Sequence, residues 1–178
     1  MMGASSAEKG ESLSYRHERT RSRVFALRFL YQQEITGASL DQMLAEENYR
    51  FSNDHLSECL SACDMRQNCE FYNFFALFDG APDEYCRMLV RGVEEQKREL
   101  DRLIRSASKH WAVFRMPVVD RCILRLAAWE ICYNDKVPAS VAVNEAVQLA
   151  KEYGGEDSSK FVNGLLGKIV SMHTEPVE

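Results

Sequence analysis

The sequence predicts an all-helical fold, and three observations support this prediction. Its 178 residues include only nine glycines and four prolines, too few breakers for a chain of many short strands and turns. Apolar residues recur three and four positions apart along most segments, and no segment alternates with the period of two that a strand shows. The length suits one domain or two small helical subdomains.

The first predicted helix covers residues 18–36. Gly37, a residue type that often follows a helix, ends it. One face of this helix carries an apolar stripe, formed by Val24, Leu27, Tyr31 and Ile35. A short helix is expected around residues 40–44, and the aromatic run at 71–78 is interpreted as core or as a face for a partner.

Four further elements follow in the second half of the chain. Pro82 opens a long helix that runs to about residue 108. Residues 118–134 are apolar around most of the helix circumference, which is typical of a helix at the centre of a bundle. A helix over 140–154 begins after a proline, and Asp157 or Ser158 can cap the last helix. The apolar stripe of that last helix is Phe161, Val162, Leu165, Leu166 and Ile169.

We expect one compact domain made of two small helical bundles. Its expected parts are a disordered leader at 1–15, an N-terminal subdomain at 16–109 with an enlarged segment at 38–80, a C-terminal subdomain at 110–172 and a tail at 173–178. The leader lacks the apolar centre of a secretory signal, and no apolar stretch approaches the roughly 20 residues that span a bilayer. A cytoplasmic protein is therefore expected, with its six cysteines as free thiols.

Positive charge gathers near the N-terminus, although the chain has a net charge of −5. Residues 16–28 hold five arginines and one acidic residue. Of the 22 cationic residues 15 are arginine, whose planar guanidinium suits phosphates, bases and carboxylates. A solvated basic helix start is one interpretation, but the helix dipole opposes cations there, which favours a ligand-binding role. The overall acidity argues against a protein that coats nucleic acid indiscriminately.

The residues of a catalytic site are not found together. The histidines lie apart, no glycine-rich loop could hold a phosphate, and no nucleophile has a base and an orienting group nearby in the sequence. We therefore expect neither an enzyme nor a cofactor. His55, Cys59, Cys63 and Cys69 could supply zinc ligands, but they lack a CxxC pair, and free thiols explain them more economically.

Charged residues also interrupt the apolar segment at 118–134. Glu130 would be buried there, so it needs an arginine or backbone donors, and we predict a structural ion pair rather than a catalytic acid. Asp120, Arg121 and Arg125 line the polar side of the same helix. They are either solvated or directed toward a protein partner.

Several segments together resemble a known family. They are RSRVFALRFLYQQEITG at 21–37, VRGV at 90–93, VDRCILRLAAWEI at 119–131, VPASVAVNEAVQLAKEYG at 137–154 and EDSSKFVNGLLGKI at 156–169. Their order and spacing resemble the NusB family of transcription antitermination proteins. The resemblance covers residues 19–37 and 84–170.

The resemblance implies a protein that binds the boxA element of ribosomal RNA leader transcripts. It would do so with the small-subunit ribosomal protein NusE and join RNA polymerase and other Nus factors. The RNA-contacting positions implied are Arg19, Arg21, Arg23, Tyr31, Asp157, Lys160 and Phe161. Asp120 would face the ribosomal protein, with Arg121 and Arg125 beside it.

Three features depart from the family pattern. Thr20 and Ser22 alternate with the arginines, the segment at 38–80 is long, and Trp129 replaces a commoner tyrosine. Two alternatives stay open: a NusB-like domain of the kind that precedes ribosomal RNA cytosine methyltransferases, which would need a further domain after residue 170, and a helical metal-binding module. Both a monomer and a homodimer are compatible with the sequence.

Overall fold

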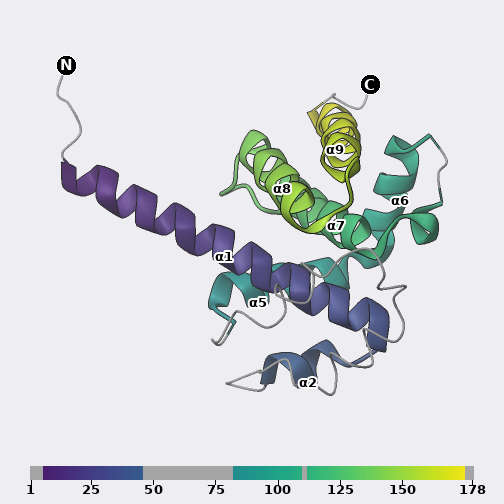
Figure 1. Cartoon of the computed structure of the whole chain (residues 1–178), viewed down its shortest axis with the longest axis horizontal. Coiled ribbons are helices and arrows are strands. Elements are labelled where there is room, and N and C mark those ends of the chain that lie inside the picture. The colour runs from purple at the N-terminus through teal and green to yellow at the C-terminus, as the bar shows by residue number, and fades with distance from the viewer. Residues whose placement is uncertain (1–5, 46–81, 110–111, 175–178) are drawn as a thin grey trace.

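The helical prediction is confirmed by a computed structural model, which describes residues 6–45, 82–109 and 112–174 (Figure 1). Regular structure in these ranges is helical throughout. The elements are α1 (Ser6–Thr36), α2 (Leu40–Ala45), α5 (Glu84–Glu95), α6 (Lys97–Ala107), the 3-10 turn η1 (Val113–Arg115), α7 (Val118–Tyr133), α8 (Ala139–Tyr153) and α9 (Ser158–Thr174). None of the described helices is long and apolar enough to cross a membrane.

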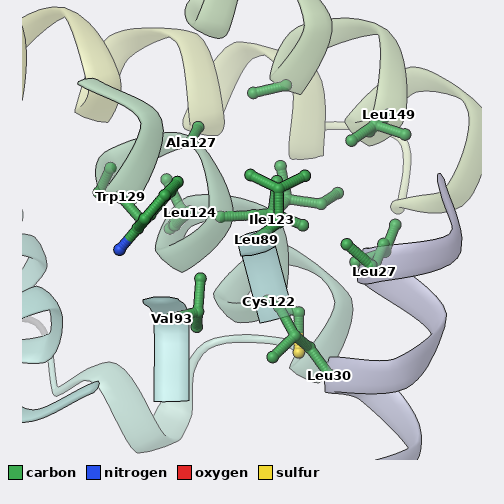
Figure 2. Packing of buried hydrophobic residues seen from close by; sticks show 14 of the residues in the cluster. Leu27, Leu30, Leu89, Val93, Cys122, Ile123, Leu124, Ala127, Trp129 and Leu149 are labelled. Atoms are coloured by element: carbon green, nitrogen blue, oxygen red, sulfur yellow. The ribbon is translucent and has the colours of Figure 1, made fainter. Parts of the chain in front are cut away.

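Helix α7 lies at the centre of the bundle, as its apolar circumference predicts. It packs against α1, α5, α6, α8 and α9, and every residue from Cys122 to Ile131 is buried. Figure 2 shows side chains from α1, α5, α7 and α8 meeting around Ile123. Helices α1, α2 and α5 pack together on one side of α7, and α8 and α9 pack against each other and against α7.

Helix α1 is longer than the sequence predicts. It begins at Ser6, so residues 6–15 are helical rather than part of a disordered leader. Ala7, Glu8 and Lys9 favour helix upstream of the apolar stripe, although Gly10 and three serines lie among them. The N-terminal half of α1 projects beyond the other helices (Figure 1). At the other end Gly37 has a φ of +69°, the left-handed conformation expected after a helix.

The single long helix predicted from Pro82 is divided into α5 and α6. Gln96 breaks it, with φ −100° and ψ 10°. The backbone hydrogen bonds from Gln96 to Gly92 and from Leu100 to Gln96 keep helical spacing across this point. The division is therefore a local bend, and it brings α6 against α7 and α9.

The helix predicted at 140–154 agrees with α8 to within one residue at each end, and α9 begins at one of the two residues expected to cap it. Pro138 directly precedes α8, and α9 begins at Ser158. Leu165 is buried in the core, whereas Phe161 is partly buried against its edge. Most of the enlarged segment, with His55, its cysteines and its aromatic run, lies outside the described residues.

Gly92 explains how the core accepts Trp129. A Cβ atom at position 92 would overlap the indole ring, so only glycine leaves room for the larger aromatic. Trp129 is 8% exposed and stacks on Tyr133, with ring centres 6.4 Å apart. The close packing of α5 and α7 thus depends on a glycine inside a helix, despite its low helix propensity.

We predict that Gly92→Ala destabilises the protein by about 1–3 kcal/mol, because the added methyl group overpacks the contact with Trp129. Gly164→Ala is the matched control. It lies on an exposed part of α9 with nothing near the added carbon, and should stabilise by about 0.5–1 kcal/mol. Denaturant unfolding measures the free energy of unfolding of both variants. Changes of the same sign in the two variants would contradict the role given to Gly92.

Candidate nucleic-acid interface

The basic end of α1 divides into an internal and an outer part. The Arg23 residue is only 3% exposed, whereas Arg19 is partly exposed and Arg21 is exposed. The guanidinium carbon of Arg19 lies 4.6 Å from the centre of the Tyr85 ring, and that of Arg21 lies 5.7 Å from the centre of the Phe25 ring. Arg19 and Arg21 therefore carry the positive charge of this end toward solvent.

Arg23 forms a buried ion pair with Glu130. Its Nε and Nη2 atoms donate to the Glu130 carboxylate at 2.8–3.1 Å, and its Nη1 lies 3.4 Å from Oε2 of Glu145. Burial alone lowers the pKa of Arg23, but the hydrogen bonds and charge of Glu130 outweigh it and raise the pKa. The structural ion pair predicted for Glu130 is confirmed. The Arg23 guanidinium was expected to contact RNA, but it lies among carboxylates, because the buried Glu130 needs a cation.

Thr20 and Ser22, the two residues that alternate with the arginines, connect α1 to α8 and to the start of α5. The Thr20 hydroxyl donates to Glu145 of α8 at 2.8 Å, and the Ser22 hydroxyl lies 2.5 Å from Asp83, the N-cap residue of α5. This departure from the family pattern therefore has a packing explanation. Together with Arg23, these side chains fix the basic end of α1 to α5, α7 and α8.

Tyr31, also expected at RNA, is buried in the core at 7% exposure. It belongs to the apolar stripe of α1, which packs inward. Arg28 is buried as well; its guanidinium lies over the Phe25 ring, and burial lowers its pKa to about 10. Neither side chain adds to the outer surface.

A second group of predicted residues lies at the start of α9. Asp157 and Lys160 are exposed, and Lys160 Nζ lies 3.5 Å from Asp157 Oδ1. The Ser158 hydroxyl donates to Asp120 at 3.0 Å and accepts the N–H of Gly155 at 2.8 Å, so it anchors the turn before α9. Phe161 packs partly on the core beside them.

The three residues expected to face a protein partner make contacts within the chain. Asp120 is 3% exposed, and burial raises its pKa, with the Ser158 hydrogen bond opposing this. Arg121 donates to Glu34 at 2.8 and 3.1 Å, and Arg125 contacts both Glu34 and Asp101. These side chains are therefore not solvated freely, because Asp120 is buried and carboxylates of α1 and α6 bind both arginines.

Glu34 joins three helices at this end of the molecule. Lys97 of α6 and the two arginines of α7 all approach its carboxylate, at 2.7–2.9 Å. Burial alone raises the pKa of Glu34, but the Lys97 hydrogen bond and the Arg125 charge lower it to about 2. This cluster fixes the C-terminal end of α1.

Sequence reasoning missed two aromatic residues. Phe114 of η1 is 77% exposed beside Arg115, and Arg121 donates to its carbonyl oxygen at 3.3 Å. Tyr85 of α5 lies between two arginines. The only available signal for Phe114 was an aromatic residue between the helix predicted to end near residue 108 and the helix predicted at 118–134. The helical spacing of α5 gave no signal for Tyr85. Among the described residues, no group of three or more His, Cys, Asp or Glu could hold a metal ion.

The fold and this site define a small all-helical binding protein with a basic helix end anchored by a buried ion pair. Residues 20–171 match the model of the NusB family. The chain belongs to the NusB family, and the relatives compared below are transcription antitermination proteins.

Individual relatives agree with this assignment. The chain is 36% identical over 157 residues to a transcription antitermination protein NusB of Clostridium botulinum, covering 85% of this chain and 99% of that protein. It is 38% identical over 159 residues to the NusB protein of Symbiobacterium thermophilum, and the match covers 85% of this chain and 88% of that protein. The solved structure of T. maritima NusB is 29% identical with a TM-score of 0.63, covering 88% of this chain and 93% of that one.

A further solved structure shows the same fold. It contains the antitermination factors NusB and NusE in complex with double-stranded RNA, and its matching chain is 22% identical with a TM-score of 0.58. The match covers 88% of this chain and 98% of that one. Family and fold agree with the resemblance found in the sequence.

We predict that Glu34→Gln destabilises the protein at pH 7 by at most about 3 kcal/mol. The folded-state pKa lies below the unfolded value of 4.5, so the stabilisation is complete above pH 4.5 and is lost as pH falls toward 2. The difference between wild type and variant should shrink over that range in denaturant unfolding.

Glu99→Gln is the control for this prediction, because its pair with Arg102 is exposed. It should cost less than about 1 kcal/mol. Equal losses for the two variants, or a loss for Glu34→Gln that does not change with pH, would contradict the role given to the cluster.

Proposed function

We propose that this protein is a cytoplasmic antitermination factor that binds boxA-type RNA together with the ribosomal protein NusE. In this role it joins RNA polymerase and other Nus factors. The observation that carries the proposal is the family match over residues 20–171, which includes Arg21 and begins one residue after Arg19. The NusB–NusE–RNA complex among the structures of the same fold supports the same pair of partners.

The proposed RNA contacts are those predicted side chains that reach solvent. Arg19 and Arg21 provide charge for phosphates, and a guanidinium can pair with a phosphate through two hydrogen bonds. Asp157, Lys160 and Phe161 form the second contact region at the start of α9, where the partly exposed ring of Phe161 can stack on a base. Arg23 and Tyr31 support the surface from inside.

The protein partner is proposed to bind near the start of α7. Asp120 and Arg125 are buried and Arg121 is partly buried, so they shape this region through their internal contacts. The exposed Phe114 ring, held next to them by η1, supplies apolar contact area, and aromatic side chains are enriched at such interfaces. NusE binding at this end would leave the basic end of α1 to the RNA.

The proposal predicts that the double variant Arg19→Ala/Arg21→Ala binds a boxA-type RNA about 10- to 100-fold more weakly at moderate salt. A plot of the logarithm of affinity against the logarithm of salt concentration has a negative slope, and each lost phosphate contact should reduce its magnitude by about 0.7–1. Fluorescence anisotropy with boxA-type and scrambled RNA measures both. Adding NusE should raise affinity for the boxA-type RNA more than for the scrambled one.

Arg98→Ala/Arg102→Ala removes the same charge from the exposed face of α6 and serves as control. It should leave affinity within about twofold. Equal losses from both double variants would show that only net charge matters. No preference of the wild type for the boxA-type RNA, with or without NusE, would contradict the proposed function.

A further inference from the structure

Tyr85 lies between two arginines of α1. Its ring centre is 4.6 Å from the guanidinium carbon of Arg19 and 5.6 Å from that of Arg23. Arg23 is buried and paired with Glu130, whereas Arg19 is partly exposed. One aromatic ring therefore connects the internal ion pair to the outer surface.

The position of the Tyr85 ring is fixed at its hydroxyl end. The hydroxyl donates to the Glu130 carboxylate, and it lies 3.5 Å from both Arg23 Nη2 and Asn134 Nδ2. Burial and the Glu130 charge raise the pKa of Tyr85, so the hydroxyl stays protonated and remains a donor at neutral pH. These contacts add to the packing of the Tyr85 ring against the core, which by itself keeps the ring beside Arg19.

The backbone of Tyr85 is fixed as well. Asp83 caps α5 by accepting the N–H of Cys86 at 2.7 Å, and its other oxygen lies 2.5 Å from the Ser22 hydroxyl of α1. The first turn of α5 is thus joined to the same stretch of α1 that carries Arg19. Helix and ring together set where Arg19 can lie.

Stacking on an aromatic face limits the orientations of a guanidinium without removing its charge. A long arginine side chain loses rotamer entropy when it binds a phosphate, and a side chain ordered in advance loses less. We propose that Tyr85 is a positioning residue for RNA binding: its ring holds the guanidinium of Arg19 in the orientation in which it contacts the RNA backbone. This inference rests on the proposed function.

The test is a double-mutant cycle on Arg19 and Tyr85. The affinity of each variant for boxA-type RNA is measured, together with its melting temperature. Tyr85→Leu should weaken binding about 3- to 10-fold. Arg19→Ala/Tyr85→Leu should bind within about twofold of Arg19→Ala alone, because the ring acts through Arg19. Tyr85→Phe keeps the ring and loses only the hydroxyl, so it should lower the melting temperature yet keep affinity within about twofold.

Tyr133→Leu is the matched control, since it removes an exposed tyrosine that lies outside the arginine pair. It should leave affinity unchanged. The inference is overturned if Tyr85→Leu binds as the wild type does, if its loss adds fully to that of Arg19→Ala, or if Tyr85→Phe loses as much affinity as Tyr85→Leu. These outcomes leave the proposed function intact, whereas a wild type that binds no boxA-type RNA overturns both.

Discussion

The buried ion pair between Arg23 and Glu130 is the constraint on which the arrangement of α1 depends. Glu130 is 1% exposed in the central helix, and an unpaired carboxylate there would be strongly destabilising. Arg23 satisfies it with three short hydrogen-bond distances. Because the guanidinium must reach α7, this stretch of α1 cannot rotate about its own axis. The directions in which the residues next to Arg23 in the sequence point are therefore fixed as well.

This fixed orientation separates inward-facing residues from residues that reach solvent within one short motif. Thr20, Ser22 and Arg23 reach α8, α5 and α7, while Arg21 stays exposed and Arg19 rests on the Tyr85 ring. At the opposite end of α1 the Glu34 cluster has the same effect on α6 and α7. Charged residues near both ends of the packed part of α1 thus place the helix, while apolar packing supplies the core between them.

Periodicity predicted the helices well, because α1, α5, α6, α8 and α9 each pack an apolar stripe against α7. It could not place the start of α1, since residues 6–15 carry no such stripe, or the bend at Gln96, where helical hydrogen bonding continues. The need of Glu130 for a cation was predictable from burial alone, but its partner was not, because 107 residues separate it from Arg23. Sequence resemblance likewise gave Arg19, Arg21 and Arg23 equal roles, and only the tertiary contacts distinguish them.

We expect Arg23 to act inside the protein and not on RNA. The double variant Arg23→Met/Glu130→Gln tests it most directly, since it removes both buried charges while keeping an oxygen acceptor for Tyr85. Measured against a boxA-type RNA over a range of salt, the folded double variant should keep its affinity within about threefold and its salt slope unchanged. A loss of affinity and slope as large as that of Arg19→Ala/Arg21→Ala would show that Arg23 contacts RNA and would contradict the account.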